Sequence, residues 1–140
     1  MTIESCGLAI KHINDALARR SNAQLKSHNV TLSQIAVLHA LSTRPNAEAT
    51  FKELERTLRV SQPTTVGLIA RLQEKGLVET CVSTDDLRVK IARLTAEGCA
   101  LEAEARVDME REEAALLAGF SREEKKQFHQ FLERVQENVE

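Results

Sequence analysis

Several features that would place a chain in a specialised class are missing from this 140-residue sequence. No apolar run approaches the roughly 18 residues that a membrane-spanning helix needs, and the first residues lack the basic start and small-residue cleavage site of a signal peptide. The three cysteines, Cys6, Cys81 and Cys99, are odd in number and show no CxxC spacing, which argues against a disulfide framework or a zinc knuckle. We therefore expect a cytoplasmic protein with reduced thiols and no membrane partner.

The sequence also lacks the short motifs that carry common catalytic chemistry. It contains no P-loop, dinucleotide-binding, zinc-protease or nucleophile-elbow pattern, and the acid-rich stretch EREE is spaced like a solvated helix face. The four histidines show no short metal-ligand spacing, so only a site assembled from distant segments could bind zinc. We predict no catalytic residues, no cofactor and no metal site.

What the sequence does contain is typical of one ordinary globular domain. Hydrophobic residues make up 42% and charged residues 29%, and a chain of this length can bury about two-thirds of its unfolded surface. Charge is distributed unevenly: residues 56–95 hold seven basic and four acidic residues, whereas residues 96–140 hold six basic and twelve acidic ones. The locally basic segment could meet a polyanion through one face, although a solvated mixed surface would give the same counts.

Start and stop signals predict three helices in the first part of the chain. Thr31 with Gln34, and Thr50 with Glu53, are capping-box pairs that open helices over 32–43 and 51–58, with Pro45 between them. A first amphipathic helix over 3–27 is indicated by an apolar stripe with steps of three and four. The stripe consists of Ile3, Cys6, Ile10, Ile13 and Leu17.

The next helix, over 61–75, has hydroxyls and an amide in a first turn where a buried helix would carry apolar residues. Ser61 can cap it, Pro63 fits its first turn, and Gly76 can end it in a left-handed conformation. Thr65, Leu68, Ile69 and Leu72 share the face expected to pack on the preceding helix. The residues left on the outer face of this helix are Ser61, Gln62, Thr64, Val66, Gly67 and Arg71. This geometry presents a helix end to a DNA major groove, although a capped surface helix in a protein-interaction domain is the alternative.

Two strand-like runs, LVETCV and RVKIARL, flank the turn-like sequence STDDL and predict a β-hairpin. Arg88 and Lys90 are two positions apart, so we expect them on one face of the return strand. From that face they could follow a phosphate backbone or enter a minor groove.

The rest of the chain predicts two helices, a long one over 96–118 that Thr95 caps and a final one that Ser121 and Glu124 open after Gly119. Three of the four phenylalanines lie near this C-terminal end. Two terminal helices on one small domain cannot easily bury each other's apolar stripes. We therefore infer a homodimer layer built from residues 1–28 and 120–140, with packing inside one chain as the alternative.

In this order the elements resemble the MarR family, the multiple-antibiotic-resistance regulators. The most specific pieces are TTVGLIARLQEKGLVE and DDLRVKIARLTAEG, the second of which holds the family's Asp-x-Arg and Leu-Thr-x-x-Gly patterns. The resemblance spans nearly the whole chain. It implies a mainly α fold with a small β-hairpin wing: one winged helix-turn-helix domain over 1–140, with a DNA-binding lobe at 31–95, a connecting helix at 96–118 and N- and C-terminal dimerisation helices.

The resemblance also implies a function and its residues. Family members are dimers that bind inverted-repeat operators in double-stranded DNA, commonly as repressors released by a small molecule or oxidant. Arg88 is similar to the wing arginine that enters the minor groove, and Asp86 to the acid that orients it. The residues expected at DNA are Ser61, Gln62, Thr64, Val66, Gly67, Arg71, Asp86, Arg88 and Lys90. A winged-helix adaptor that binds protein instead of DNA is the alternative function.

Departures from the family pattern concern the wing and the recognition helix. Thr80 and Cys81 stand where the family often has basic residues, so nonspecific DNA affinity is expected to be modest. Val66 replaces a frequent hydroxyl residue and could meet a thymine methyl group.

The effector site is indicated more weakly. His12 and His39 lie on helices that border the ligand pocket in family members, although each also suits an ordinary helix face. Cys6 resembles the peroxide-reactive cysteine of the organic-hydroperoxide-sensing branch, but that branch holds its thiolate with tyrosines and this chain has none. Cys81 on the wing is a second candidate for oxidation, and Cys99 is expected in the core.

Overall fold

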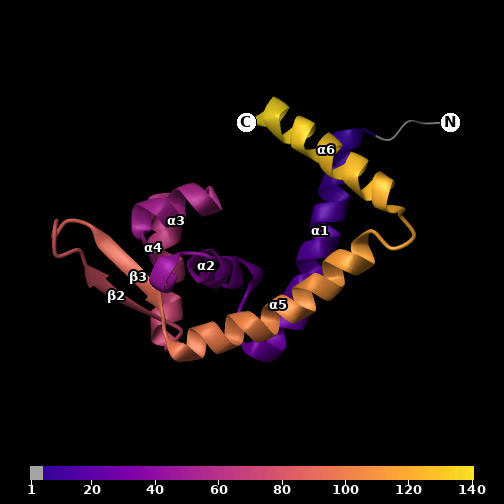
Figure 1. Ribbon diagram of the computed structural model, residues 1–140. Helices are drawn as coiled ribbons and strands as arrows, with labels where there is room; N and C mark the ends of the chain where they lie inside the picture. Colours follow the sequence, from indigo (N-terminus) through magenta and orange to yellow (C-terminus); the bar gives the residue numbers. More distant parts are fainter. Residues whose placement is uncertain (1–4) are drawn as a thin grey trace. The chain divides into compact units, whose positions relative to one another are not determined.

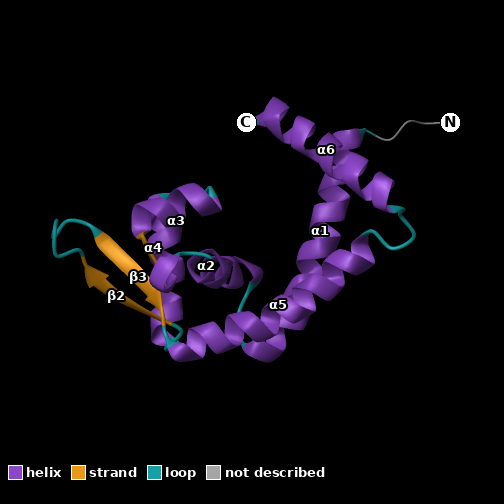
Figure 2. Ribbon diagram, in the orientation of Figure 1, coloured by secondary structure: helices purple, strands orange, loops and turns teal. Residues whose placement is uncertain are grey.

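The computed structural model describes residues 5–140, so Ile3 and the start of the predicted first helix lie outside the described residues. The fold is mainly helical with a small antiparallel sheet, which confirms the predicted fold class (Figures 1 and 2). The helices are α1 (Cys6–Leu25), α2 (Leu32–Ser42), α3 (Phe51–Leu58), α4 (Gln62–Glu74), α5 (Ala96–Leu116) and α6 (Arg122–Val139), with short 3-10 helices η1 (Lys26–His28) and η2 (Pro45–Ala47). The strands are β1 (Glu48–Thr50), β2 (Val78–Val82) and β3 (Lys90–Leu94).

The chain forms two compact units, one extending to Asp108 and the other spanning Met109–Glu140. The first unit contains α1 to α4, the whole sheet and the first part of α5. The second contains the end of α5 and all of α6. The proposed DNA-contacting residues all lie in the first unit, so its geometry can be described without reference to the second.

Most of the capping residues predicted from the sequence form the expected contacts. Thr50 accepts a hydrogen bond from the Glu53 N–H at 3.0 Å, but the Glu53 carboxylate accepts from the Thr50 hydroxyl at 3.1 Å instead of completing the predicted capping box. Thr31 and Ser121 each complete a capping box with the residue three positions later, and Ser61 accepts a hydrogen bond from the backbone N–H of Thr64. Gly76 follows α4 with φ +74°, a left-handed conformation that glycine adopts without steric cost. These caps fix where the helices begin and end.

The sheet has three strands in the order β1-β3-β2, and β1 was not predicted. Ala49 of β1 lies opposite Ala92 of β3, and both are buried. At three residues β1 is too short to show an alternating pattern, and its only partner in the sheet is β3, more than 40 residues later in the chain. The predicted wing hairpin is present, with Val78 opposite Leu94 and Val82 opposite Lys90.

The core lies where α2, α3 and α4 pack on the inner face of the sheet. Leu38, Leu41, Leu54, Ile69 and Leu72 are at most 1% exposed, and burial of each such side chain contributes about 1.5–3 kcal/mol. The buried face of α4 packs on this core, and the opposite face of α4 is exposed to solvent.

The start of α5 packs closely on the start of the wing. Thr95 donates a hydrogen bond to the carbonyl of Gly76 at 2.7 Å, and a Cβ built at Gly98 would lie 2.0 Å from the carbonyl oxygen of Leu77. The expectation that Cys99 lies in the core is wrong, because Cys99 is exposed. The buried positions of this part of α5 are Gly98, Glu102 and Ala105, and Cys99 is rotated about 100° away from Gly98.

Candidate nucleic-acid interface

The helix-turn-helix consists of α3 and α4, joined by a turn in which Arg59 is left-handed. Thr65 is fully buried, and its hydroxyl donates to the Ser61 carbonyl at 3.0 Å, which holds the first turn of α4 to its cap. The Ser61 hydroxyl donates to the Thr64 hydroxyl at 2.9 Å. The hydroxyls of the first turn are therefore held in place by hydrogen bonds, while the Gln62 side chain is exposed.

The outer face of α4 is the face that helical spacing predicted. Ser61, Gln62, Thr64, Val66, Gly67 and Arg71 are exposed, whereas Thr65, Ile69 and Leu72 are buried. A Cβ built at Gly67 would meet no atom within 4 Å, so nothing inside the protein requires glycine there. Val66 is 41% exposed and adds an apolar group to an otherwise polar surface.

The wing turn holds Arg88 through a single carboxylate. Asp86 accepts hydrogen bonds from the Arg88 backbone N–H at 3.0 Å and from its guanidinium at 3.1 and 3.2 Å. The guanidinium contact, followed by the backbone contact, lowers the pKa of Asp86 below its usual range. Arg88 is 91% exposed, so the pair engages Nε and Nη2 of the guanidinium and leaves the rest of the group accessible.

The expectation that Arg88 and Lys90 share one face of a strand is wrong. Strand β3 begins only at Lys90, and Arg88 lies in the turn that Asp86 stabilises. The turn closes through two further bonds, from the Val89 N–H to the Asp86 carbonyl and from the Ser83 N–H to the Val89 carbonyl. Arg88 thus projects from the wing tip rather than from the strand.

A groove of about 560 Å³ lies between the helix-turn-helix and the wing. Four of the predicted DNA-contacting residues meet there, namely Gln62, Val66, Arg88 and Lys90. Ser61, Thr64, Gly67, Arg71 and Asp86 do not line it. The groove also contains residues that the sequence reading missed: Thr50, Phe51, Lys52, Glu53, Glu55, Arg56, Thr65 and Val89. Arg56 had contributed to the basic count of its segment, and that count was the one signal that could have identified it.

Arg93 contributes less to the basic surface than its sequence position suggests. Its Nε lies 2.8 Å from a Glu48 carboxylate oxygen, and its Nη1 lies 3.9 Å from Oε1 of Glu79, a weaker partner. Hydrogen bonding to Glu48 is the main reason that the pKa of Arg93 rises above its usual range. The charge of Arg93 is therefore largely compensated within the sheet, whereas Arg71 on α4 and the cations of the groove and wing tip remain exposed.

None of the candidate effector and redox residues lines the groove. The Nδ1 atom of His39 lies 3.1 Å from Oε1 of Glu102, a carboxylate that is almost fully buried. His12 is exposed on α1, and Cys6 is the exposed first residue of that helix, while Cys81 is exposed on β2. Within residues 5–140, no group of His, Cys, Asp and Glu is arranged to hold a metal ion. None of the described helices is long and apolar enough to cross a membrane.

Comparison with known proteins agrees with this architecture. The profile of the MarR family matches residues 28–88. An uncharacterized HTH-type transcriptional regulator of Bacillus subtilis, YwoH, is 36% identical over 112 residues, which is 80% of each chain.

Solved structures show the same fold at lower identity. The S. aureus MepR–DNA complex is similar with a TM-score of 0.93 at 21% identity, covering 97% of this chain and 99% of that one. The regulator RdhR-CbdbA1625 in its 2,4-dichlorophenol-bound form gives a TM-score of 0.84 at 21% identity, covering 94% and 77%. Proteins of this kind are transcriptional regulators and not enzymes, in agreement with the missing catalytic motifs. The chain belongs to the MarR family of winged helix-turn-helix transcriptional regulators.

Proposed function

We propose that this regulator acts as a homodimer that binds an inverted-repeat operator, with α4 in the major groove and Arg88 in the adjacent minor groove. The observation that carries the proposal is the pairing of an exposed polar first turn on α4 with a wing arginine held by Asp86. Backbone N–H groups at a helix N-terminus suit phosphate, and Gln62 can read a base edge. The solved complex of MepR with DNA provides a precedent for DNA binding by a protein of this fold.

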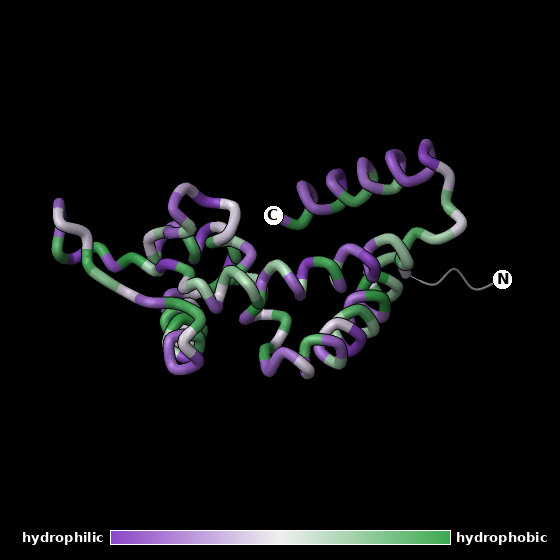
Figure 3. Tube along the Cα trace, turned by 60° about the horizontal axis from the view of Figure 1, so that its bottom comes forward, coloured by the Kyte–Doolittle hydropathy of each residue, from purple (hydrophilic) through white to green (hydrophobic). Residues whose placement is uncertain are grey.

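The dimer is supported by apolar side chains that α6 leaves uncovered. Helix α6 is hydrophobic along one side and hydrophilic along the other (Figure 3). The exposed side chains on or near it are Phe120, Phe131, Leu132, Val135 and Val139. α1 also exposes Leu8, Ile10 and Ile13. Faces of this kind on a small protein are suited to an isologous contact with a second copy.

For regulation, we propose repression that is relieved by a small molecule or an oxidant. The solved structure of RdhR-CbdbA1625 with 2,4-dichlorophenol provides a precedent for a ligand on this fold. His12 and His39 remain the proposed ligand-contacting residues, and Cys6 the proposed redox residue. A cytoplasmic location follows for a protein whose partner is the chromosome.

The proposed DNA contact can be tested with Arg88→Ala and a matched control, Lys126→Ala. Lys126 lies outside the groove, on the polar side of α6 with Gln130 and Glu133. Each phosphate-neutralising cation that is removed should reduce the slope of log affinity against log salt by about one unit, and Arg88→Ala removes one from each protomer, so the slope for the dimer should fall by about two units. Arg88→Ala should show this change and Lys126→Ala should not. Weak duplex binding that is the same in wild type and Arg88→Ala would favour a winged-helix protein adaptor instead.

A further inference from the structure

We propose that the groove between α3, α4 and the wing binds the sugar–phosphate strand that separates the major groove from the adjacent minor groove, with Arg56 and Lys90 as phosphate contacts. The proposal rests on the DNA-binding function proposed above and adds an assignment for Arg56, a residue outside the recognition helix and the wing. It also gives the groove a defined occupant, one DNA backbone strand.

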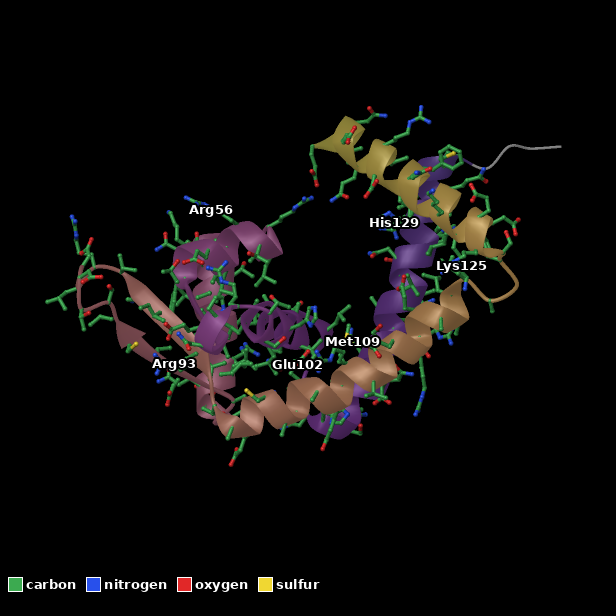
Figure 4. The ribbon with its side chains drawn as sticks, in the orientation of Figure 1. Arg56, Arg93, Glu102, Met109, Lys125 and His129 are labelled. Atoms are coloured by element: carbon green, nitrogen blue, oxygen red, sulfur yellow. The ribbon has the colours of Figure 1, made fainter. Side chains whose placement is uncertain are left out.

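The position of the groove follows from the two elements that flank it. If α4 enters a major groove and Arg88 the neighbouring minor groove, one backbone strand must pass between them. The groove lies at this place, because its lining includes Gln62 and Val66 of α4 as well as Arg88 and Lys90 of the wing. Arg56 projects from α3 and completes the lining (Figure 4).

The charge of the lining suits a polyanion. Four basic residues line the groove, namely Lys52, Arg56, Arg88 and Lys90, against the two acids Glu53 and Glu55. Glu53 already pairs with Arg44, so its negative charge is compensated within the protein. Arg88 is likewise paired with Asp86. The remaining groups, Lys52, Arg56 and Lys90 against Glu55, still carry a net positive charge, which favours a strand with one negative charge per nucleotide.

Two features prepare the cations for this role. The ammonium of Lys90 lies 6.0 Å from the centroid of the Phe51 ring, which is the limit of a cation–π contact. Phe51 is held in place as the first residue of α3, and its ring restrains the long side chain of Lys90. Less conformational entropy is then lost when Lys90 binds a phosphate. Arg56 is exposed, and a guanidinium fork suits two oxygens of one phosphate.

The test compares Arg56→Gln, Lys90→Gln and the double variant with Lys126→Gln, which removes the same charge from the polar side of α6. Fluorescence anisotropy would follow binding to a mixed-sequence duplex of about two helical turns over a salt series. Because the proposed dimer carries each groove cation twice, each groove substitution should reduce the salt slope by about two units, and the double substitution by about four. Lys126→Gln should leave the slope unchanged. Circular dichroism melting curves would show that the variants keep the wild-type fold, as expected for exposed side chains.

The contribution of Phe51 gives a second, independent measurement. Phe51→Leu keeps an apolar side chain but removes the ring, so it should weaken duplex binding in the wild-type background. In the Lys90→Gln background it should have no further effect, because the ring then has no cation to hold. Equal weakening in both backgrounds would overturn the role of Phe51 in positioning Lys90.

The outcomes separate this inference from the proposed function. A slope that falls with Arg88→Ala but not with Arg56→Gln or Lys90→Gln would overturn the groove as a backbone site while DNA binding stands. An equal fall with Lys126→Gln would also overturn it, because the effect would then be one of total charge. Absence of salt-dependent duplex binding by the wild-type protein would instead refute the DNA-binding function itself.

Discussion

Gly67 offers a test in which stability and function should change in opposite directions. It lies inside α4, where glycine is less favourable than alanine by about 0.8–1.0 kcal/mol. Because an added Cβ would meet no protein atom within 4 Å, no clash offsets this gain. Gly67→Ala should therefore raise the free energy of unfolding by nearly the full amount, and the melting temperature by roughly 2–5 °C.

The same methyl group should weaken DNA binding, because Gly67 lies on the face of α4 that we place in the major groove. Displacement of the helix far enough to lose one base contact would remove about 1–3 kcal/mol, so we expect roughly a tenfold loss of affinity. Gly7 provides the control: it is an exposed helical glycine on α1 with no atom within 4 Å of a built Cβ. Because α1 is a proposed dimerisation helix, sedimentation accompanies this control: a Gly7→Ala protein that remains dimeric should bind DNA with unchanged affinity.

Thermal melting and anisotropy on the same preparations would measure both effects. A raised melting temperature with unchanged or tighter DNA binding would remove Gly67 from the interface. A lowered melting temperature would refute the structural argument that the site has room for a methyl group.

Four further outcomes are expected. Asp86→Asn removes a negative charge near DNA yet should weaken binding, because Arg88 loses the carboxylate that orients it; tighter binding in anisotropy would show that net charge outweighs preorganisation. Hydrogen bonding depresses the pKa of Asp86 in the folded protein. The stabilising effect of the ionised Asp86 carboxylate is therefore fully present above the unfolded-state pKa of about 3.9, and it is lost only as pH falls through the lower folded-state pKa. The difference in affinity between wild type and Asp86→Asn should consequently stay constant from about pH 5 upwards, and a titration of that difference near neutral pH would contradict this. Gly98→Ala should destabilise the fold by about 1–3 kcal/mol or more in urea unfolding, since its methyl would meet the Leu77 carbonyl. Phe131→Asp should yield monomers in sedimentation experiments, and a dimer of wild-type stability would exclude this face of α6.

Features set by neighbouring residues could be predicted from the sequence. Caps such as those at Thr31, Ser61 and Ser121 involve residues three positions apart, so the pattern that predicts a cap also contains its partner. The same holds for the buried and exposed faces of α4, which helical spacing determines once Thr65 and Ile69 are placed inside. The helices and the hairpin were found for this reason.

Features set by distant pairing could not be predicted in the same way. Glu48 and Arg93 are 45 positions apart, and only the assembled sheet makes them a pair that removes a cation from the predicted basic surface. Strand β1 exists because β3 is available beside it. Arg88 lies in a turn and not in the predicted strand, because hydrogen bonds to Asp86 stabilise the turn in place of further strand pairing.

The candidate site shows the same division. The exposed residues of α4 follow from helical spacing, and the Asp86–Arg88 pair was implied by the resemblance to the MarR family. The groove, in contrast, requires α3 and the wing to lie on either side of α4. Phe51 and Arg56 line that groove only in the assembled structure, and no local pattern links either of them to Lys90. The recognition surface was therefore predicted in part, and the groove beside it was not.

Selection of bound sequences from a random duplex library tests the central claim most directly, with the reduced wild-type protein and Arg88→Ala compared side by side. The account predicts enrichment of a two-fold repeat whose half-sites lie about one helical turn apart, with enrichment lost or strongly reduced for Arg88→Ala. Failure of the wild-type protein to enrich any sequence, or enrichment that Arg88→Ala leaves intact, would contradict it.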